Sequence, residues 1–229
     1  IISLIFFVIL LVFFCIRFLY LVWQLKKCDP AENRKVVKRY RNKDEIPGVS
    51  TIIVLGSGGH TTEMLNIVKL LNFRNYSPRS YVVARTDPVS AIKVIDLENE
   101  KESDLAKQRY TIENVARSRE VKQSYFTSTF TTLLSILMCF PIVIRSKPDL
   151  ILCNGPGTCV PICLVAFLLK IFFINRNVKI VFIESYCRTK TVSLSGKLLI
   201  WFTDLFVIQW PSLQNLSDPM KVKYFGRLF

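Results

Sequence analysis

The first 25 residues form an apolar run that only Ser3, Cys15, Arg17 and Gln24 interrupt. As an α-helix this run would be about 37 Å long, which exceeds the roughly 30 Å hydrocarbon core of a bilayer. The alternative is a cleaved signal peptide, whose apolar region is normally about 7–15 residues long and ends at a small-residue cleavage site. The run is longer than that and ends in no such site, so we expect a retained transmembrane anchor at residues 1–25.

The segment after this run is basic. Residues 26–47 carry eight Lys or Arg residues against four Asp or Glu residues. Because cytosolic loops of membrane proteins are enriched in Lys and Arg, this flank predicts a cytosolic linker at 26–48 and a lumenal or exterior N-terminus. The seven cysteines agree, since they lack metal-ligand spacing and most lie in apolar runs, as is typical of a reducing compartment. We therefore expect a single-pass protein with a cytosolic main domain.

The remaining residues, 49–229, have the length of one domain. Short β-rich runs alternate there with longer apolar segments, and the expected strands consist of consecutive apolar residues. This alternation predicts a parallel sheet covered on both faces, an α/β, Rossmann-like, doubly wound domain. We expect strands at Thr51–Leu55, Ser80–Ala84, Thr111–Ala116, Leu150–Cys153, Lys179–Ile183 and Leu205–Gln209, and helices near Thr62–Leu71, Val89–Leu97, Ser128–Ile144, Val160–Ile174 and Ser193–Phe202.

Two later segments are apolar enough to raise the question of further membrane spans. Phe126–Ile144 is uncharged but carries six Ser or Thr residues and Pro141, and Thr158–Leu169 carries Pro161. Core helices beneath a parallel sheet have the same pattern, so we expect buried or membrane-surface helices instead. A contact in which one helix face rests in the membrane interface stays open.

A glycine-rich loop, Gly56–Thr62, directly follows the first expected strand and opens a helix. Ligands of an open parallel sheet bind at the carboxyl ends of its strands, and a helix N-terminus offers free N–H groups to an anion. Ser57, Thr61 and Thr62 add side-chain hydroxyl groups to the backbone N–H groups that Gly58 and Gly59 offer. The loop fits the dinucleotide fingerprint poorly, because that pattern requires glycine at the position of Thr61.

His60, in this loop, is the only histidine of the chain. It could donate a hydrogen bond to a sugar hydroxyl or act as a general base. It could equally cap the helix or order the loop. The residues alone leave both interpretations open.

Two more loops are expected at the same edge of the sheet. Asn154–Thr158 contains Gly155 and Gly157, which suit either a tight strand-to-helix turn or a close approach to a ligand. The other loop begins at Glu184, an acid that ends a strand, and includes Arg188, which could bind a phosphate. Structural ion pairing is the alternative for Glu184. We find no metal-ligand set and no Ser–His–Asp order with a nucleophile elbow.

The C-terminal residues are unusually apolar. Chain ends are commonly polar and frayed unless something holds them. Four large apolar side chains among the last six residues therefore indicate docking of about residues 221–229, either on this domain or on another chain. These four are Tyr224, Phe225, Leu228 and Phe229.

Together these motifs resemble a known family. The glycine loop is similar to the acceptor-side loop of GT-B glycosyltransferases that act on lipid-linked sugars. Nearly the whole chain resembles the membrane-anchor subunit of the two-chain UDP-N-acetylglucosamine transferase of asparagine-linked glycosylation. The segments that carry this resemblance are the anchor, Leu-Gly-Ser-Gly-Gly-His-Thr-Thr-Glu-Met (55–64), Arg-Ser-Arg-Glu-Val (117–121), Cys-Asn-Gly-Pro-Gly-Thr (153–158), Ile-Glu-Ser-Tyr-Cys-Arg (183–188), Gln-Trp-Pro (209–211) and the Tyr-Phe-Gly-Arg tail.

The resemblance implies an activity and its partners. The family's complex adds the second N-acetylglucosamine to dolichol-diphosphate-N-acetylglucosamine on the cytosolic face of the endoplasmic reticulum, without a cofactor. This chain would be the acceptor-side half of the GT-B enzyme, not an enzyme on its own. A soluble subunit that binds UDP-N-acetylglucosamine would supply the other half and dock on the C-terminal tail. The residues themselves agree on one point, because a GT-B enzyme needs two doubly wound domains and residues 49–229 suit only one.

Site residues follow from the same resemblance. His60 is the candidate base for the attacking hydroxyl, with Glu184 as second choice. The acceptor sugar and its diphosphate would lie against Ser57, Gly58, Gly59, Thr61, Thr62, Asn154, Gly155, Gly157 and Arg188.

Two other functions stay open at this point. One is a self-contained, membrane-tethered, NAD(P)-dependent oxidoreductase, and the other is a scaffold that contributes no site residue. Nucleic-acid binding is disfavoured because the net charge of +14 is spread along the chain, with +4 in residues 26–47 and +6 in residues 170–229, instead of forming one stripe.

Overall fold

The computed structural model describes residues 2–26, 48–101, 109–117, 125–155, 157–216 and 222–228. The expected linker at 26–48, apart from its two ends, lies outside these residues, as do residues 118–121 of the third quoted motif, Pro156 and Phe229. The elements in chain order are α1 (Ile2–Lys26), β1 (Thr51–Val54), α3 (Gly59–Lys69), β2 (Arg79–Ala84), α4 (Pro88–Lys101), β3 (Tyr110–Val115), α5 (Tyr125–Ser146), β4 (Leu150–Asn154), α6 (Cys159–Ile171), β5 (Lys179–Ile183), α7 (Leu194–Leu199), β6 (Leu205–Ile208), the 3₁₀ helix η2 (Pro211–Leu216) and β7 (Val222–Tyr224).

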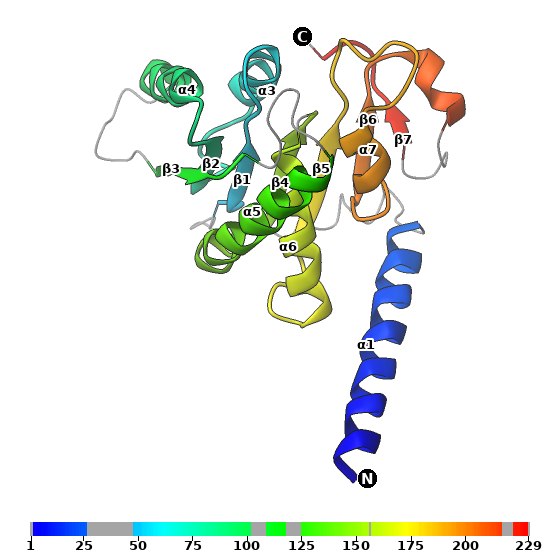
Figure 1. The fold of residues 1–229 in the computed structure, drawn as a ribbon. Coiled ribbons are helices and arrows are strands. Elements are labelled where there is room, and N and C mark those ends of the chain that lie inside the picture. Colours follow the sequence, from blue (N-terminus) through cyan, green and yellow to red (C-terminus); the bar gives the residue numbers. More distant parts are fainter. Residues whose placement is uncertain are drawn as a thin grey trace.

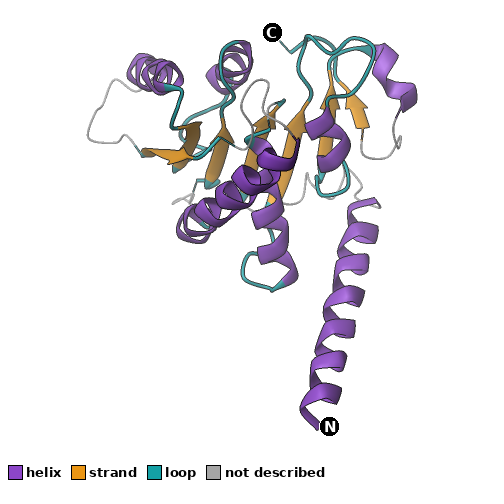
Figure 2. Ribbon diagram, in the orientation of Figure 1, coloured by secondary structure: helices purple, strands orange, loops and turns teal. Residues whose placement is uncertain are grey.

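The strands form one seven-stranded sheet in the order β3-β2-β1-β4-β5-β6-β7, and every neighbouring pair is parallel. The chain moves outward from β1 through β2 to β3, then returns to place β4 on the other side of β1. The strand order therefore reverses between β1 and β4, where a doubly wound sheet opens its ligand crevice. Helices cover both faces (Figure 2). The predicted α/β, doubly wound parallel fold is confirmed.

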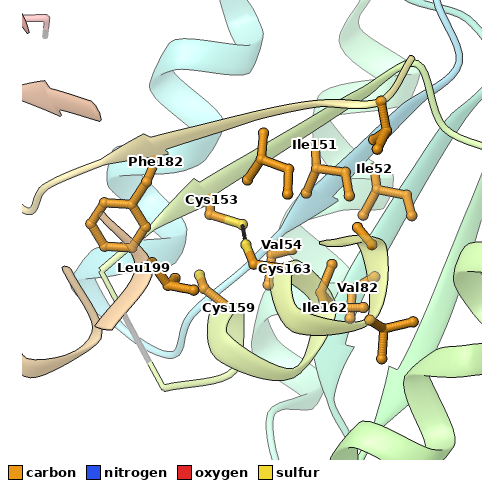
Figure 3. Packing of buried hydrophobic residues seen from close by; sticks show 14 of the residues in the cluster. Ile52, Val54, Val82, Ile151, Cys153, Cys159, Ile162, Cys163, Phe182 and Leu199 are labelled. Atoms are coloured by element: carbon orange, nitrogen blue, oxygen red, sulfur yellow. Dashed lines mark hydrogen bonds between the residues drawn. The ribbon is translucent and has the colours of Figure 1, made fainter. Parts of the chain in front are cut away.

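Alternate residues of each central strand enter two separate cores, because successive side chains of a strand point to opposite faces. Ile53 and Leu55 pack in the cluster that α3 and α4 cover. Ile52 and Val54 pack in the larger cluster beneath α5, α6 and α7. Figure 3 shows this second core, where β1 and β4 side chains meet those of α6. Burial on both faces explains the continuous apolar strands of the sequence.

Several elements differ from expectation. The strand β7 was not predicted, because three residues with one buried side chain, Val222, give no periodic signal. The helix α3 begins three residues earlier than expected, since Gly58 at φ 64° turns the chain directly into the helix. The helix α6 ends at Ile171, and α7 spans only Leu194–Leu199.

The N-terminal helix α1 projects from the sheet domain (Figure 1). Its segment Phe6–Lys26 is long and apolar enough to cross a membrane. Its C-terminal half lies against the domain, because Leu21 and Leu25 are buried in a cluster with Phe167 and Ile171 of α6. The contact lies at the amino edge of the sheet, where α6 ends before β5 begins.

The helix α5 has one apolar face in the core and one exposed. Ser128–Ser146 is long and apolar enough to cross a membrane, and 28% of its most apolar 18-residue stretch is buried. Cys139, Ile142 and Val143 belong to the core, whereas Phe130, Leu133, Leu134 and Leu137 are exposed. One face is thus covered by the sheet and the other is apolar and open.

Candidate functional site

A pocket of about 490 Å³ lies at the carboxyl edge of the sheet, where the chain order reverses. The loops that follow β1, β4 and β5 meet there, as the parallel topology requires. The lining residues are Gly59, His60, Glu63, Gly155, Glu184, Ser185, Cys187, Arg188 and Ser193. The three loops that the sequence predicted at one edge are therefore brought together.

His60 is the second residue of α3 and points toward the loop after β4. Its Nδ1 lies 3.0 Å from Oδ1 of Asn154, which is fully buried at the end of β4. Gly155 has φ +65°, and a Cβ there would lie 2.5 Å from Cε1 of His60. The glycine is therefore required both by its left-handed backbone and by the close approach of the imidazole ring.

Glu63 connects these loops, although no sequence pattern predicted a role for it. Its carboxylate accepts hydrogen bonds from Nδ2 of Asn154 and Oγ of Ser185, both at 3.0 Å, and from the backbone N–H of Tyr186 at 3.3 Å. It stands three residues after His60 and so shares its helix face. That i, i+3 spacing beside a glycine loop was the available signal, but a helical Glu usually lies on the surface.

Glu184 is fully buried, and donors of its own loop surround its carboxylate. One oxygen accepts from the backbone N–H of Ser185 at 3.1 Å. The other accepts from the N–H of Ser193 at 2.8 Å and from its Oγ at 3.0 Å. A Cβ at Gly196 would lie 2.7 Å from that second oxygen, so the packing leaves no room for a side chain. Glu184 thus closes the β5–α7 loop onto the N-terminus of α7, which Ser193 caps.

The structure places the glycine-loop hydroxyls away from the pocket. Ser57 accepts a hydrogen bond from the guanidinium of Arg117. Thr61 is buried, donates to the carbonyl of Gly56 and contacts Oγ of Ser90 at 2.6 Å. Thr62 is exposed and accepts from Lys93 at 3.2 Å, in a separate groove between α3 and α4.

The remaining predicted residues divide between the pocket and its surroundings. Gly59, Gly155 and Arg188 line the pocket together with His60 and Glu184, and Asn154 lies directly behind His60. Gly58 is exposed beside the pocket, and the carbonyl of Gly157 accepts from Val160 in the first turn of α6. Among the residues that the structure describes, no group of three His, Cys, Asp or Glu side chains could hold a metal ion.

The C-terminal segment, Val222–Leu228, is partly held by the domain. Val222–Tyr224 pairs with β6 as the edge strand β7. Tyr224 is 40% exposed and Phe225 is 63% exposed, Leu228 is half-buried, and Phe229 lies outside the described residues. The segment is thus attached to this domain through β7, and the side chains of Tyr224 and Phe225 stay exposed.

The family model and the relatives that this chain matches all point to the same family. A family model described as "Oligosaccharide biosynthesis protein Alg14 like" matches residues 51–228. The chain is 49% identical over 181 residues to the mouse protein named UDP-N-acetylglucosamine transferase subunit ALG14, which covers 77% of this chain and 82% of that protein. The human protein of that name is 47% identical over 193 residues, with 82% and 88% covered. The fission yeast Schizosaccharomyces pombe protein is 47% identical over 178 residues, with 76% and 81% covered.

Solved structures share the fold at low sequence identity. MurG of Acinetobacter baumannii matches with a TM-score of 0.53 at 15% identity, over 77% of this chain and 45% of that one. LpCGTa, solved in complex with UDP, matches with a TM-score of 0.50 at 10% identity, over 78% of this chain and 52% of that one. The chain thus spans about half the length of the solved structures that it matches.

Proposed function

The chain belongs to the Alg14 family of oligosaccharide biosynthesis proteins, and we propose that it is the membrane-anchored, acceptor-side subunit of a UDP-N-acetylglucosamine transferase. In this proposal the complex adds the second N-acetylglucosamine to dolichol-diphosphate-N-acetylglucosamine. The chain is inactive alone, and a soluble subunit supplies the site for UDP-N-acetylglucosamine. The naming of the mouse and human relatives as subunits supports a partner of this kind.

The observation that carries the proposal is the pocket at the sheet's reversal point, with His60 on one wall and Arg188 on another. The first N–H groups of α3 face this edge, and a helix N-terminus favours an anion such as a diphosphate. The exposed guanidinium of Arg188 adds a charge that suits the same group. An acceptor diphosphate between these elements would present its sugar to His60.

The hydrogen bonds around His60 assign it a tautomer suited to a base. Because Nδ2 of Asn154 donates to Glu63, the Oδ1 that faces His60 is an acceptor, so Nδ1 of the imidazole carries the proton. That assignment leaves Nε2 as the acceptor nitrogen. In the proposed step the acceptor hydroxyl oxygen bonds to C1 of the donor sugar, its proton passes to Nε2, and the C1–O bond to UDP breaks with the electron pair on UDP.

The membrane part of the proposal depends on α1. Its length, its composition and the basic residues after it support a single-pass anchor with the sheet domain in the cytosol. The match to an oligosaccharide biosynthesis family supports the endoplasmic reticulum as the membrane. Such an anchor would keep the pocket near a lipid-linked acceptor that cannot leave the bilayer. No feature of the pocket favours the oxidoreductase, whose fingerprint requires glycine where Thr61 is buried.

Replacement of His60 tests the assignment of the base. The full chain carrying His60→Ala, co-expressed with its soluble subunit, would be assayed in membranes for transfer from UDP-N-acetylglucosamine to the dolichol-linked acceptor. Loss of a general base lowers kcat by about 10²- to 10⁴-fold. Asn66→Ala, on the exposed side of the same helix, is the matched control and should keep full activity. Unchanged turnover in His60→Ala would assign the histidine a structural function and favour the scaffold.

Docking of the soluble subunit is tested by point substitution, because deletion of the tail would also remove part of β7. Phe225→Ser should reduce co-purification of the soluble subunit from detergent extracts. Leu70→Ser, at a position 77% exposed at the end of α3, controls for loss of an exposed apolar side chain elsewhere. Equal co-purification of the two variants would contradict the assignment of the tail as the docking segment.

A further inference from the structure

Three side chains from separate segments stack behind the pocket. Cζ of Arg227 lies 4.6 Å from the centroid of the Tyr186 ring, and the Tyr186 and Trp210 rings lie 5.0 Å apart. Nε1 of Trp210 also donates to the carbonyl of Tyr186 at 2.7 Å. We call these three side chains the tail stack. It joins the C-terminal segment to the β5–α7 loop, although about 40 residues of sequence separate them.

Gly226 is what turns the chain back toward this loop. It follows the edge strand β7 and has φ +86°, a conformation that side chains other than glycine rarely adopt. A Cβ built there meets no atom within 4 Å, so only the backbone conformation requires glycine. Arg227 therefore reaches Tyr186 through a fixed turn at Gly226.

The tail stack continues into the pocket through the backbone of Tyr186. The N–H of Tyr186 donates to Glu63, Glu63 accepts from Asn154, and Asn154 contacts the His60 imidazole. Four consecutive contacts thus connect Arg227 with His60. Tyr186 also stands between the pocket residues Ser185 and Cys187, so a displacement of its backbone would displace the pocket wall and Arg188 beyond it.

We propose that Arg227 is a positioning residue, through which docking of the soluble subunit on the C-terminal segment sets the affinity of the pocket for its lipid-linked acceptor. This inference rests on the proposed function and adds a regulation to it. The guanidinium holds Tyr186 against Trp210, and Tyr186 in turn holds Glu63 and the pocket wall. The C-terminal segment is then both the docking site for the partner and the element that shapes the acceptor pocket.

The test separates docking from acceptor affinity. Arg227→Gln, Arg227→Lys and the matched control Arg176→Gln, which removes another exposed arginine stacked on an aromatic ring (Phe173) outside this segment, are co-expressed with the soluble subunit in membranes. Arg227→Gln should keep co-purification and the KM for UDP-N-acetylglucosamine, while its KM for the lipid-linked acceptor rises roughly three- to tenfold. Arg227→Lys should recover much of this loss, because an ammonium group also binds an aromatic face. Arg176→Gln should leave both KM values unchanged.

Two results would overturn the inference. One is an acceptor KM that does not change in Arg227→Gln. The other is a loss of co-purification while the complex that still forms keeps a normal acceptor KM, since Arg227 would then serve docking alone. A structural contribution to the fold alone would lower kcat and yield without separating the two KM values.

A second measurement does not depend on transferase activity. Addition of the soluble subunit to the purified full chain should slow amide hydrogen exchange across residues 184–188 in the wild type and in Arg227→Lys, but not in Arg227→Gln. Slowed exchange in a complex that fails to use the lipid-linked acceptor would reject the proposed function and keep the coupling. Unchanged exchange in an active wild-type complex would reject the coupling and keep the proposed function.

Discussion

The sheet carries a buried acidic network at each of its edges, and the two differ in access. At the amino edge, Arg79 and Glu98 form a fully buried ion pair with N–O distances of 2.7 and 2.8 Å. The Arg79 guanidinium also donates to the carbonyls of Phe73 and Tyr76, and Tyr81 donates to Glu98 at 2.5 Å. At the carboxyl edge, Glu63 accepts three hydrogen bonds of similar length beside an open pocket.

The difference shows that a buried charge does not by itself indicate a functional site. Burial, followed by the neighbouring Glu98 carboxylate, raises the pKa of Tyr81 far above its ordinary value. Strongly shifted pKa values are commonly used to find active sites, but they also occur in structural ion-pair networks. The Arg79 network is sealed, and its groups satisfy one another. The Glu63 network borders a volume that a ligand can enter, so we expect the first to govern stability and the second to govern activity.

Glu98→Gln should have the largest effect on stability of all the substitutions considered. Removal of one partner leaves the Arg79 charge buried without its carboxylate, which typically costs about 3–5 kcal/mol. Thermal unfolding of the detergent-solubilised chain, followed by circular dichroism, measures the loss. Glu100→Gln is the matched control, because its ion pair with Lys69 is exposed and should contribute nothing measurable. Equal melting temperatures for the two variants would contradict the structural function of the buried pair.

Glu63→Gln should act in the opposite way, with a loss of activity that exceeds the loss of stability. The amide keeps the shape of the carboxylate but loses the charge that accepts from Asn154, Ser185 and Tyr186. A hydrogen bond to a buried charged group is worth about 1.5–3 kcal/mol, which corresponds to roughly a 10- to 100-fold change in kcat/KM. The reconstituted pair of subunits is the sample, and kcat/KM for the lipid-linked acceptor is the measurement. A variant that melts earlier but keeps its kcat/KM would make the two networks equivalent and end the distinction.

The sequence predicted the sheet better than the site. A strand is determined by neighbouring residues, whereas the site depends on contacts between residues far apart in the chain. Continuous apolar runs such as Ile52–Leu55 determine a central strand locally, and strand–helix alternation determines its parallel pairing. The glycine loop predicted the position of His60 for the same reason. The function of Glu63 depends on Asn154, 91 residues away, and on Ser185, 122 residues away, and no local pattern carries contacts of that range.

Other parts of the site could not be predicted because the sequence does not show which of several neighbouring groups a side chain or strand contacts. Thr61 and Thr62 are adjacent hydroxyl residues in the glycine loop, but the helix turn directs one into the core and the other into a different groove. The strand β7 depends on pairing with β6, which three residues cannot encode by themselves. Packing thus decided which polar groups of a correctly predicted loop face the pocket.

The exposed apolar face of α5 lies between the two edges of the sheet, and each substitution there should have a smaller effect on activity. The helix α1 meets the domain at the amino edge, whereas the pocket lies at the carboxyl edge, about 16 Å away along a five-residue strand. The helix α5 runs between these edges with Leu133 and Leu137 exposed. We therefore expect this face to contact the bilayer or the isoprenoid chain of the acceptor.

Leu133→Gln combined with Leu137→Gln tests this expectation. Loss of a half-exposed leucine from an apolar contact costs about 1 kcal/mol, so loss of both should lower activity on the dolichol-linked acceptor roughly 30-fold. Activity on an acceptor with a short, water-soluble lipid should stay the same. Ile92→Gln with Ile95→Gln on α4 is the control on the other face of the sheet, since both isoleucines are also exposed. An equal loss on both acceptors would indicate a structural effect and not a lipid contact.

The smallest expected effect is on the rate of thiol labelling. This rate measures solvent access to a side chain, which is the property that distinguishes the two networks. Cys187 is exposed on the pocket wall, whereas Cys153 is fully buried next to Asn154. Burial, and then hydrogen bonding with Cys159 and Cys163, raises the pKa of the Cys153 thiol well above its ordinary value, so little reactive thiolate forms near neutral pH. In a chain with Cys15→Ser and Cys28→Ser, we expect a maleimide at pH 7.5 to label Cys187 and to leave Cys153 unlabelled until the chain is denatured.

Added lipid-linked acceptor should slow labelling of Cys187 about twofold or more, because an occupied pocket restricts approach to its wall. If the acceptor slowed labelling no more than dolichol phosphate without the sugar did, the pocket would recognise the phosphate group alone, and the sugar would lie nearer to the soluble subunit than to His60.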